Sequence, residues 1–458
     1  MRSLTELDGE VNAASVKVAE LIKTVTDEMS FVETDKFIGS GTSLGYAAGE
    51  GVVSGIAAIN DIQVGIFAVN GEVLMGGIGK SNAAKISKCV NSAIKMSAPV
   101  IGILDTAGAR FAEGIEALEG YGKIMSAFSA AYGIVPTILV VKGNNLGMLS
   151  YLPAFCDFTV CYDKSINATT SPLILAAQTT ADVSLVGTAE IMAANGVSTA
   201  TVKNDEELKK VLTDLLDAVV IPVIDNDDDG NRVCKLSGNK GVPDVINEIF
   251  DKGTFVEIKK DYAHEVVAGF ARLNGIAVGV VANNQAVADG RLTPAGAEKI
   301  TGFINTLESY DIPLINLVDS KGASVCLKCQ PELIKNIGEM MYALNVSSIE
   351  KISVITGNAL GAAYVAFANK SLYDYVIAWE NAKIGMLDGR QSAELVYGSA
   401  IAQAEDRQKA EETFVSAYED ENMSAVVVAE KGFIDNVIDP DFTRQYLIAA
   451  LQAYINKR

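Results

Sequence analysis

Hydrophobic positions follow the same order of helical periods and short apolar runs in each half of this chain. Residues 4–29 place leucines and valines on a rough helical period, which predicts an N-terminal helix. A short strand is expected at residues 31–33 and again, after a second helical stretch, at residues 255–257. Two apolar runs then flank residues 59–61 in the first half and residues 273–275 in the second, and each pair of runs predicts a hairpin.

Helices and buried strands alternate through the rest of each half. A helix is expected to begin near Ser81 in the first half and near Thr293 in the second, and each ends before a proline. Four continuous apolar runs predict strands that are covered on both faces. This alternation favours two α/β lobes. The four runs occupy residues 100–104, 137–141, 314–318 and 351–355.

A constant offset of 214 residues relates the two halves, which indicates an internal duplication. We therefore expect one lobe over residues 1–224 and a second over residues 238–458. The segment 204–240, which contains a charged helix and the polar run Asp225–Gly230, is the predicted linker. Residues that recur at the offset include Gly55 and Gly269, Asn60 and Asn274, Asp105 and Asp319, and Gly143 and Gly357.

The composition is typical of a globular protein with an acidic surface. The 458 residues are 49% hydrophobic and 21% charged, and the formal net charge is −20. This charge argues against nucleic acid or an anionic membrane as the main partner. An anionic substrate remains possible, because a local basic pocket can sit on an acidic protein. No apolar run is long enough to span a membrane, and residues 1–8 lack the layout of a signal peptide. A cytoplasmic location is therefore expected.

Two short motifs resemble ion or nucleotide sites but are incomplete. The run Asp225–Gly230 matches the first half of a calcium loop, but Leu236 stands where the loop needs a bidentate glutamate, so a solvated linker is favoured. Gly79-Lys80-Ser81 follows a strand as a P-loop ending does, but Leu74 replaces the first glycine of that motif. Neither motif predicts a site.

The cysteines and the single histidine carry little chemistry in the sequence. Cys326 and Cys329 form a lone CxxC with no second ligand pair, so two ordinary thiols are expected rather than a zinc site. His264 is the only histidine and lies just before a predicted strand, which suits packing or solvent. The chemistry is therefore not expected to depend on an imidazole or on a metal.

Three glycine-containing loops, each after a predicted buried strand, carry the candidate catalytic and binding residues. The loop Asp105–Gly114 has small residues that let a ligand approach the backbone, and Arg110 can offer charge to a phosphate or a carboxylate. Loops at residues 143–148 and 357–363 link buried strands to helix starts, where free N–H groups can bind a developing oxyanion. The alternatives are a tight turn with an Arg–Glu pair and close helix–sheet packing.

At these loops the chain resembles the acyl-CoA carboxyltransferase family. That family includes the β subunits of propionyl- and acetyl-CoA carboxylases and the carboxyltransferase subunits of methylmalonyl-CoA decarboxylase, glutaconyl-CoA decarboxylase and transcarboxylase. The likeness runs from about Phe31 to Arg444. The matching stretches are Gly49–Gly55, Gly76-Gly77, Gly108–Arg110, Glu113-Gly114, Tyr151 with Pro153-Ala154, Gly269–Arg272, Ile312-Pro313, Val318-Asp319, Gly361 with Ala363-Tyr364, Ala378-Trp379, Ala429–Asp435 and Thr443-Arg444.

The resemblance implies a fold, a reaction and a set of partners. The fold is two tandem crotonase-like lobes, each a ββα spiral. Acyl-CoA is held by the first lobe, and biotin on a separate carrier protein meets the second. Carboxybiotin releases CO2, the ureido anion takes the α-proton, and the resulting enolate attacks CO2. The implied partners are a biotin carboxyl carrier protein and a biotin carboxylase or a membrane decarboxylase subunit. A homo-oligomer, either a dimer or a hexamer built as a trimer of dimers, is also implied.

The resemblance also assigns roles to individual positions. The N–H groups of Gly147 and Met148 would hold the thioester oxygen, and those of Ala362 and Ala363 would hold the biotin ureido oxygen. Val365 stands at the substrate-discriminating position. Coenzyme A binding is assigned to Gly76, Gly77, Ala107, Gly108, Ala109 and Arg110, and the biotin-side loop to Gly322 and Gly361.

Two oxyanion positions depart from the family pattern, and three functions stay open. Met148 and Ala362 each stand where the family has glycine. The leading hypothesis is a carboxyltransferase subunit that acts on a short acyl-CoA of the propionyl or acetyl class. The alternatives are a subunit of a sodium-pumping decarboxylase, which runs the same half-reaction in reverse, and a degenerate partner without activity. A simple hydratase is disfavoured, since no glutamate pair follows an oxyanion loop.

Overall fold

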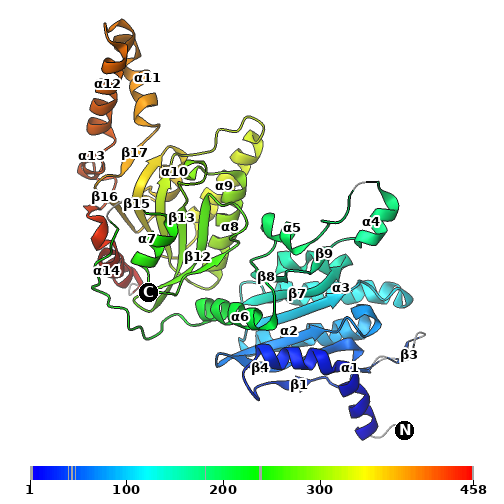
Figure 1. Ribbon diagram of the computed structural model, residues 1–458. Coiled ribbons are helices and arrows are strands. Elements are labelled where there is room, and N and C mark those ends of the chain that lie inside the picture. The colour runs from blue at the N-terminus through cyan, green and yellow to red at the C-terminus, as the bar shows by residue number, and fades with distance from the viewer. Residues whose placement is uncertain are drawn as a thin grey trace. The chain divides into compact units, whose positions relative to one another are not determined.

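The structure is a computed structural model that describes residues 4–39, 41–42, 45–46, 48–180, 182–236 and 240–455 (Figure 1). The chain divides into two compact units, the first ending at Val220 and the second beginning at Ile221. Residues 221–224 pair with the second unit, because Ala277 N donates to Pro222 O (2.8 Å) and Ile224 N donates to Gly275 O (3.0 Å). Each unit is described separately.

The first unit is a mixed sheet with helices on its faces. The strand order is β1-β4-β5-β6-β7-β8-β10, and β9 pairs with the far end of β7. Strands β1, β4 and β5 are antiparallel, and the neighbours from β5 onward are parallel. The strands are β1 (Val32–Thr34), β4 (Val52–Ile59), β5 (Ile62–Val69), β6 (Val100–Thr106), β7 (Thr137–Leu146), β8 (Phe158–Tyr162), β9 (Ile166–Ala168) and β10 (Ala200–Val202), beside a separate short pair, β2 (Gly41–Thr42) and β3 (Gly45–Tyr46). The helices are α1 (Leu4–Val25), α2 (Lys80–Met96), α3 (Ile115–Ala131), α4 (Pro172–Gln178), α5 (Ala189–Ala194) and α6 (Asp205–Val220), with 3-10 turns η1 (Ala48–Gly51), η2 (Leu74–Gly76), η3 (Phe111–Glu113) and η4 (Gly147–Phe155).

The second unit repeats this sheet. Its order is β11-β12-β13-β14-β15-β16-β18, and β17 pairs with the far end of β15. The strands are β11 (Val256–Ile258), β12 (Val266–Leu273), β13 (Ile276–Asn283), β14 (Leu314–Ser320), β15 (Lys351–Leu360), β16 (Tyr375–Trp379), β17 (Lys383–Gly385) and β18 (Asn436–Ile438). The helices are α7 (Val242–Ile249), α8 (Pro294–Ser309), α9 (Gln330–Val346), α10 (Ala362–Phe367), α11 (Gly389–Gln403), α12 (Arg407–Asn422), α13 (Ala425–Glu430) and α14 (Thr443–Ile455), with 3-10 turns η5 (Ala288–Gly290) and η6 (Pro440–Phe442).

The matching elements confirm the duplication expected from the sequence. Strands β4 to β7 begin and end 214 residues before strands β12 to β15. The offset of 214 residues is not kept after β15, and between β17 and α13 the second unit carries α11 and α12. These two helices lie side by side and extend away from the sheet of that unit (Figure 1). Tyr397 of α11 stacks on Phe414 of α12, with ring centroids 4.9 Å apart, so the two helices are packed together.

The cores explain why the central strands read as continuous apolar runs. Strands β6 and β14 are buried along nearly their whole length. In the first unit a core cluster joins the sheet to α2 and α3, and in the second a core cluster joins the sheet to α7 and α14. A parallel strand with helices over it must be apolar on both faces.

The first helix is shorter than the sequence pattern predicts. It ends at Val25 rather than at residue 29. The Asp27 carboxylate accepts hydrogen bonds from Asn60 N (3.0 Å) and Asp61 N (2.9 Å), which lie in the turn between β4 and β5. The Asp27 side chain must point at the hairpin turn to accept hydrogen bonds from these two backbone N–H groups. The chain therefore leaves the helix before this residue.

The Gly-Asn stretches after residues 141 and 355 are strands and not the loops that the sequence predicts. Strand β7 continues to Leu146 and β15 continues to Leu360. The extra residues pair with short later strands, Asn144 with Ile166 of β9 and Asn358 with Lys383 of β17. The sequence pattern missed the extension because it depends on partners about twenty residues away, whereas local apolar periodicity ends earlier.

Two buried lysines occupy equivalent positions in the units. Lys85 and Lys299 are 0% and 2% exposed. The Lys85 ammonium donates to Val52 O, and that of Lys299 donates to Val266 O (2.8 Å) and Tyr262 O (2.9 Å). Burial lowers the pKa of both side chains, and it lowers the pKa of Lys299 to about 8. The two units therefore also share a buried lysine. It joins α2 to the hairpin β4–β5 in the first unit and α8 to the hairpin β12–β13 in the second.

Replacing Lys299 with methionine is expected to remove a pH-dependent contribution to stability. The unfolded chain holds the lysine proton up to about pH 10.5, whereas the folded chain loses it near pH 8. The free energy of unfolding of the wild type should therefore rise, relative to the Lys299→Met variant, by roughly 2 kcal/mol between pH 7 and pH 10. Urea unfolding at a series of pH values measures this difference. The exposed Lys335 on α9 provides the control, since Lys335→Met should track the wild type at every pH.

Candidate functional site

Two stretches that are distant in sequence form one surface in the first unit. Ala107 N donates to Met75 O (2.9 Å), Ile78 N donates to Gly108 O (2.8 Å), and Arg110 N donates to Ile78 O (2.9 Å). Gly76 has a φ of +65°, and a Cβ on it would lie 2.0 Å from Asp105 O, so only glycine fits beside the loop. The candidate coenzyme A residues, 76–77 and 107–110, therefore lie together.

The Arg110 side chain is buried and bonds to other groups of the protein. It is 6% exposed and forms an ion pair with the fully buried carboxylate of Glu50. Its Nε donates to Gly77 O (2.8 Å), its Nη2 donates to Glu50 O (3.0 Å), and Glu113 lies 3.4 Å from its Nη1. The guanidinium thus joins the loop to η1 and to the residue that follows η2. This arrangement fits the alternative interpretation of the sequence, a tight turn with an Arg–Glu pair, better than a charge presented to a ligand.

Asp105 joins this loop to the extension of β7. Its carboxylate accepts a hydrogen bond from Asn144 N (3.0 Å). A Cβ on Gly71 or on Gly143 would lie 2.3 or 2.4 Å from the carboxylate oxygens, so a larger residue at either position would displace the Asp105 carboxylate. A Cβ on Gly147 would lie 3.7 Å from the Gly108 Cα. The start of η4 is therefore next to the loop that bears the candidate coenzyme A residues.

The start of η4 offers backbone donors at this surface. Gly147 has a φ of +78°, and no side chain caps the turn among the described residues. Helix starts leave their first N–H groups without intrahelical acceptors, and such groups bind oxygen anions. Met148 is 46% exposed, so part of its surface is open at this place.

The second unit repeats the arrangement at the same offset. The Asp319 carboxylate accepts hydrogen bonds from Asn358 N (2.8 Å) and Asn358 Nδ2 (3.0 Å). A Cβ on Gly322 would lie 3.1 Å from Leu360 O. The loop that follows β14 is therefore next to the end of β15, as in the first unit.

Helix α10 begins at this point with a backbone that only glycine adopts readily. Gly361 has φ 50° and ψ −119°, and its N–H donates to Gly385 O (2.9 Å). No side chain of the described residues caps α10. The N–H groups of Ala362 and Ala363 open the helix, where intrahelical acceptors are absent. Val365, one turn from Gly361, is 46% exposed.

In each unit an arginine side chain holds the loop that follows β6 or β14. The arginine comes from a different segment of the chain in each unit. In the first unit Arg110 is on the loop and reaches Gly77 O. In the second unit Arg291 stands at the position equivalent to Gly77 and reaches back to the loop, donating to Lys321 O (2.7 Å) and Ala323 O (3.2 Å). Both units therefore hold this loop by arginine hydrogen bonds. In the first unit the arginine lies on the loop, and in the second it lies on the segment that the loop contacts.

Sequence reasoning missed the contacts of four of these residues. Glu50 lies in the quoted stretch Gly49–Gly55, but its partner is 60 residues away and no local pattern pairs them. Nothing in the local pattern marks Arg291. Asp105 opens the candidate loop Asp105–Gly114 and recurs at the offset as Asp319, but the sequence did not predict the hydrogen bonds that their carboxylates accept.

Other sequence motifs do not join the site. The Glu113 carboxylate accepts from Lys80 N (2.7 Å) at the start of α2, where a P-loop would hold a phosphate. The His264 side chain is exposed. The expectation of two ordinary thiols is wrong, because Cys326 and Cys329 form a disulfide bond. Within the described part of the chain, no group of three or more His, Cys, Asp or Glu side chains is placed to hold a metal ion. None of the described helices has the length and apolar character needed to cross a membrane.

Comparison with known proteins agrees with the resemblance. Residues 14–458 match the carboxyl transferase domain family. The chain is 32% identical to methylmalonyl-CoA decarboxylase subunit alpha of Veillonella parvula and 32% identical to the propionyl-CoA carboxylase beta chain of Cereibacter sphaeroides; each match covers 96% of this chain and 90% of the relative. The structure resembles crystalline transcarboxylase 12S with a TM-score of 0.91 and 28% identity, covering 98% of this chain and 92% of that one. That crystal structure is described as a hexamer with methylmalonyl-CoA bound.

These matches confirm the expected α/β fold of two tandem crotonase-like lobes. They cover both units and nearly the whole length of the relatives. The expected class of enzyme is confirmed by the same matches. The chain belongs to the carboxyl transferase family.

Proposed function

We propose that this protein is the carboxyltransferase subunit of a biotin-dependent enzyme and moves CO2 between a biotinyl carrier protein and the α-carbon of a short acyl-CoA. The observation that carries the proposal is the pair of equivalent backbone sites at Gly147 and Gly361. Each is a helix start without a side-chain cap, next to a loop pinned by an arginine. Two oxygen-binding sites suit a reaction in which two enolate-like species form.

In this proposal the first unit holds the acyl-CoA. Gly76, Gly77 and residues 107–110 form a surface of small residues on which the pantetheine chain can lie. The N–H groups of Gly147 and Met148 hold the thioester oxygen as negative charge develops there. Arg110 acts through the loop, which it positions, and does not contact the phosphates. Because the Met148 side chain is 46% exposed, it borders the acyl group without filling the site.

The second unit is proposed to receive biotin. Biotin would supply a ureido group that carries CO2 and accepts the α-proton. The residues present fit this group at the first position of α10, where Ala362 follows the half-buried Gly361 and no side chain caps the helix, whereas Ala363 is fully buried in the isolated chain. The N–H groups of Ala362 and Ala363 hold the ureido oxygen, and Gly322 keeps the neighbouring loop close without a side chain. Val365 is proposed to face the acyl substituent and to select among substrates.

The proposed partners follow from the same assignment. They are a biotin carboxyl carrier protein and a biotin carboxylase, in an assembly of six copies of this chain. The similarity to a methylmalonyl-CoA decarboxylase subunit favours one alternative, in which a membrane decarboxylase subunit replaces the biotin carboxylase and the half-reaction runs in reverse. The cytoplasmic location expected from the sequence remains a prediction.

A carboxyl transfer assay tests the proposal in both directions. We expect turnover when carboxylated carrier protein is mixed with acetyl-, propionyl- or butyryl-CoA, and reverse transfer from methylmalonyl-CoA to free carrier. Propionyl-CoA is expected to be among the best acceptors. The absence of turnover with every substrate, together with no binding of coenzyme A by calorimetry, would identify a non-catalytic partner and overturn the proposal.

A further inference from the structure

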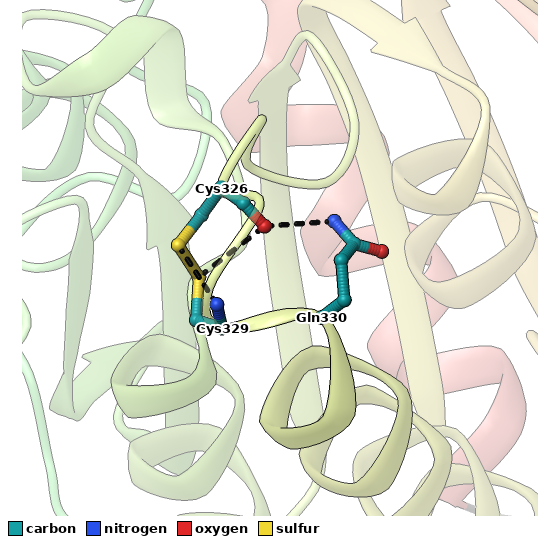
Figure 2. The surroundings of a disulfide bond; sticks show 3 residues. All are labelled: Cys326, Cys329 and Gln330. Carbon is teal, nitrogen blue, oxygen red and sulfur yellow. Dashed lines mark hydrogen bonds between the residues drawn. A yellow bond between two sulfur atoms is a disulfide. The ribbon is translucent and has the colours of Figure 1, made fainter.

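A disulfide bond lies in the loop between β14 and α9 of the second unit (Figure 2). It joins Cys326 and Cys329, whose Cα atoms are 5.5 Å apart, a normal separation for a disulfide. Both cysteines are half-buried. Beside and between them Val325 and Leu327 are 86% and 91% exposed. The bond is therefore open to a reagent or to a protein that recognises apolar residues around it.

The surroundings of the bond distinguish the two sulfur atoms. Cys329 N donates to Cys326 Sγ (3.1 Å), and Gln330 Nε2 donates to Cys326 O (2.9 Å), as Figure 2 shows. Cys329 is the N-cap of α9, a helix of 17 residues, so the Cys326 sulfur lies at a helix N-terminus. An N–H donor and the positive end of a helix both stabilise a thiolate. Cys326 is therefore the better leaving group and the better nucleophile of the pair.

The other four cysteines are not disulfide-bonded, and most of them are less accessible than this pair. Cys89, Cys156, Cys161 and Cys234 are free thiols, and three of them are buried. Burial raises the pKa of each thiol, to about 12 for Cys89. Thiols that stay protonated react slowly. Redox chemistry of the folded chain is thus directed to one loop.

We propose that Cys326 and Cys329 form a reversible thiol–disulfide site, opened by dithiol reductants and closed by disulfide oxidants. A reductant thiolate attacks Cys329 Sγ, the S–S bond breaks, and its electron pair stays on Cys326 as a thiolate held by Cys329 N–H. The second thiol of the reductant then displaces Cys329 and closes the reductant's own disulfide. Two electrons and two protons pass to the cysteines in total, and the reductant leaves oxidised.

The position of the bond connects its state to the second unit's candidate site. The loop begins at Lys321, and Ser324 N donates a hydrogen bond to Leu292 O (2.8 Å). Reduction would therefore loosen residues 325–329, which continue directly from the part of the loop that contains Gly322. Only the expected effect on carboxyl transfer rests on the proposed function; the existence of the redox site does not.

Alkylation of the full-length native protein tests the site without any activity measurement. The protein is treated with diamide or with dithiothreitol, exposed to iodoacetamide and mapped by peptide mass spectrometry. Cys326 and Cys329 are expected to be labelled roughly tenfold more after reduction, with Cys89 and Cys161 unlabelled in both states. Equal labelling before reduction would mean that no bond forms. A bond that resists dithiothreitol in the folded protein would mean that it is purely structural. Either result overturns the proposal.

Hydrogen exchange and carboxyl transfer complete the test. Exchange of residues 325–329 should quicken on reduction in the wild type and in Cys161→Ser, but should not respond to redox reagents in Cys326→Ser/Cys329→Ser. Unchanged exchange in the wild type would overturn the claim that the bond constrains the loop. The transfer rate should depend on redox state in the wild type and in Cys161→Ser, but not in Cys326→Ser/Cys329→Ser. No turnover in either state would count against the proposed function, whereas the labelling result would stand.

Discussion

Replacing Arg110 with methionine is expected to destabilise the first unit by about 3–5 kcal/mol. The variant keeps an unbranched apolar stem but removes the charge that balances the buried carboxylate of Glu50. It also removes the donors to Gly77 O and Glu50 O, which join the loop to η2 and η1. Affinity for coenzyme A should fall at least about tenfold, because the loop is no longer held. Urea unfolding followed by circular dichroism measures the stability, and calorimetry measures coenzyme A binding.

Two variants separate charge balance from general damage. Arg110→Met combined with Glu50→Gln removes both charges and should recover part of the lost stability. Lys80→Met breaks the exposed ion pair with Glu116 and should change the stability far less than Arg110→Met does. If Arg110→Met were no less stable than Lys80→Met, the buried pair would not hold the loop. If it kept its stability but lost coenzyme A binding, Arg110 would contact the ligand directly.

Replacing Gly361 with alanine is expected to lower kcat for carboxyl transfer by about 100-fold. The glycine has φ 50° and ψ −119°, and a Cβ would lie 3.1 Å from Met386 O. Alanine would therefore shift the backbone and turn the N–H groups of Ala362 and Ala363 away from the proposed ureido oxygen. The KM for acyl-CoA should change little, since the first unit is proposed to bind it. Steady-state kinetics with varied acyl-CoA and varied carrier protein gives both values.

Two further variants, one at the equivalent glycine of the first unit and one in a helix away from the site, show whether the effect belongs to Gly361. Gly147→Ala, at φ +78°, should instead weaken acyl-CoA binding as well as slow the reaction. Gly338→Ala lies in α9, where an added Cβ meets nothing within 4 Å, and should leave kinetics unchanged. Equal effects of Gly361→Ala and Gly147→Ala on the KM for acyl-CoA would contradict the proposed division of labour between the units.

Much of the fold was predictable because it rests on local patterns. Continuous apolar runs placed β6 and β14 within two residues of their observed ends. The recurrence of residues at one offset predicted two related units, and the structure places β4 to β7 and β12 to β15 at that offset. The candidate loops were also found in this way, since glycine and aspartate recur where backbone must come close to backbone.

The details of the candidate site were less predictable because they depend on partners distant in sequence. Arg110 was expected to offer its charge to a ligand, but its partner Glu50 lies on η1, in a turn with no local signal for pairing. Arg291 was not singled out, because only the folded unit brings it to Lys321 and Ala323. The same reason accounts for the extension of β7, which needs β9 as a neighbour.

The sequence by itself determined the α/β class, the duplication and the loops that bear the candidate chemistry, because apolar periodicity and repeated glycines are local properties. The tertiary structure alone decided which charges are buried and paired, how each loop is pinned, and that Cys326 and Cys329 are joined. Those outcomes follow from close packing of segments that are far apart in the chain. Burial makes an unpaired charge costly, and the fold determines which opposite charge lies within reach.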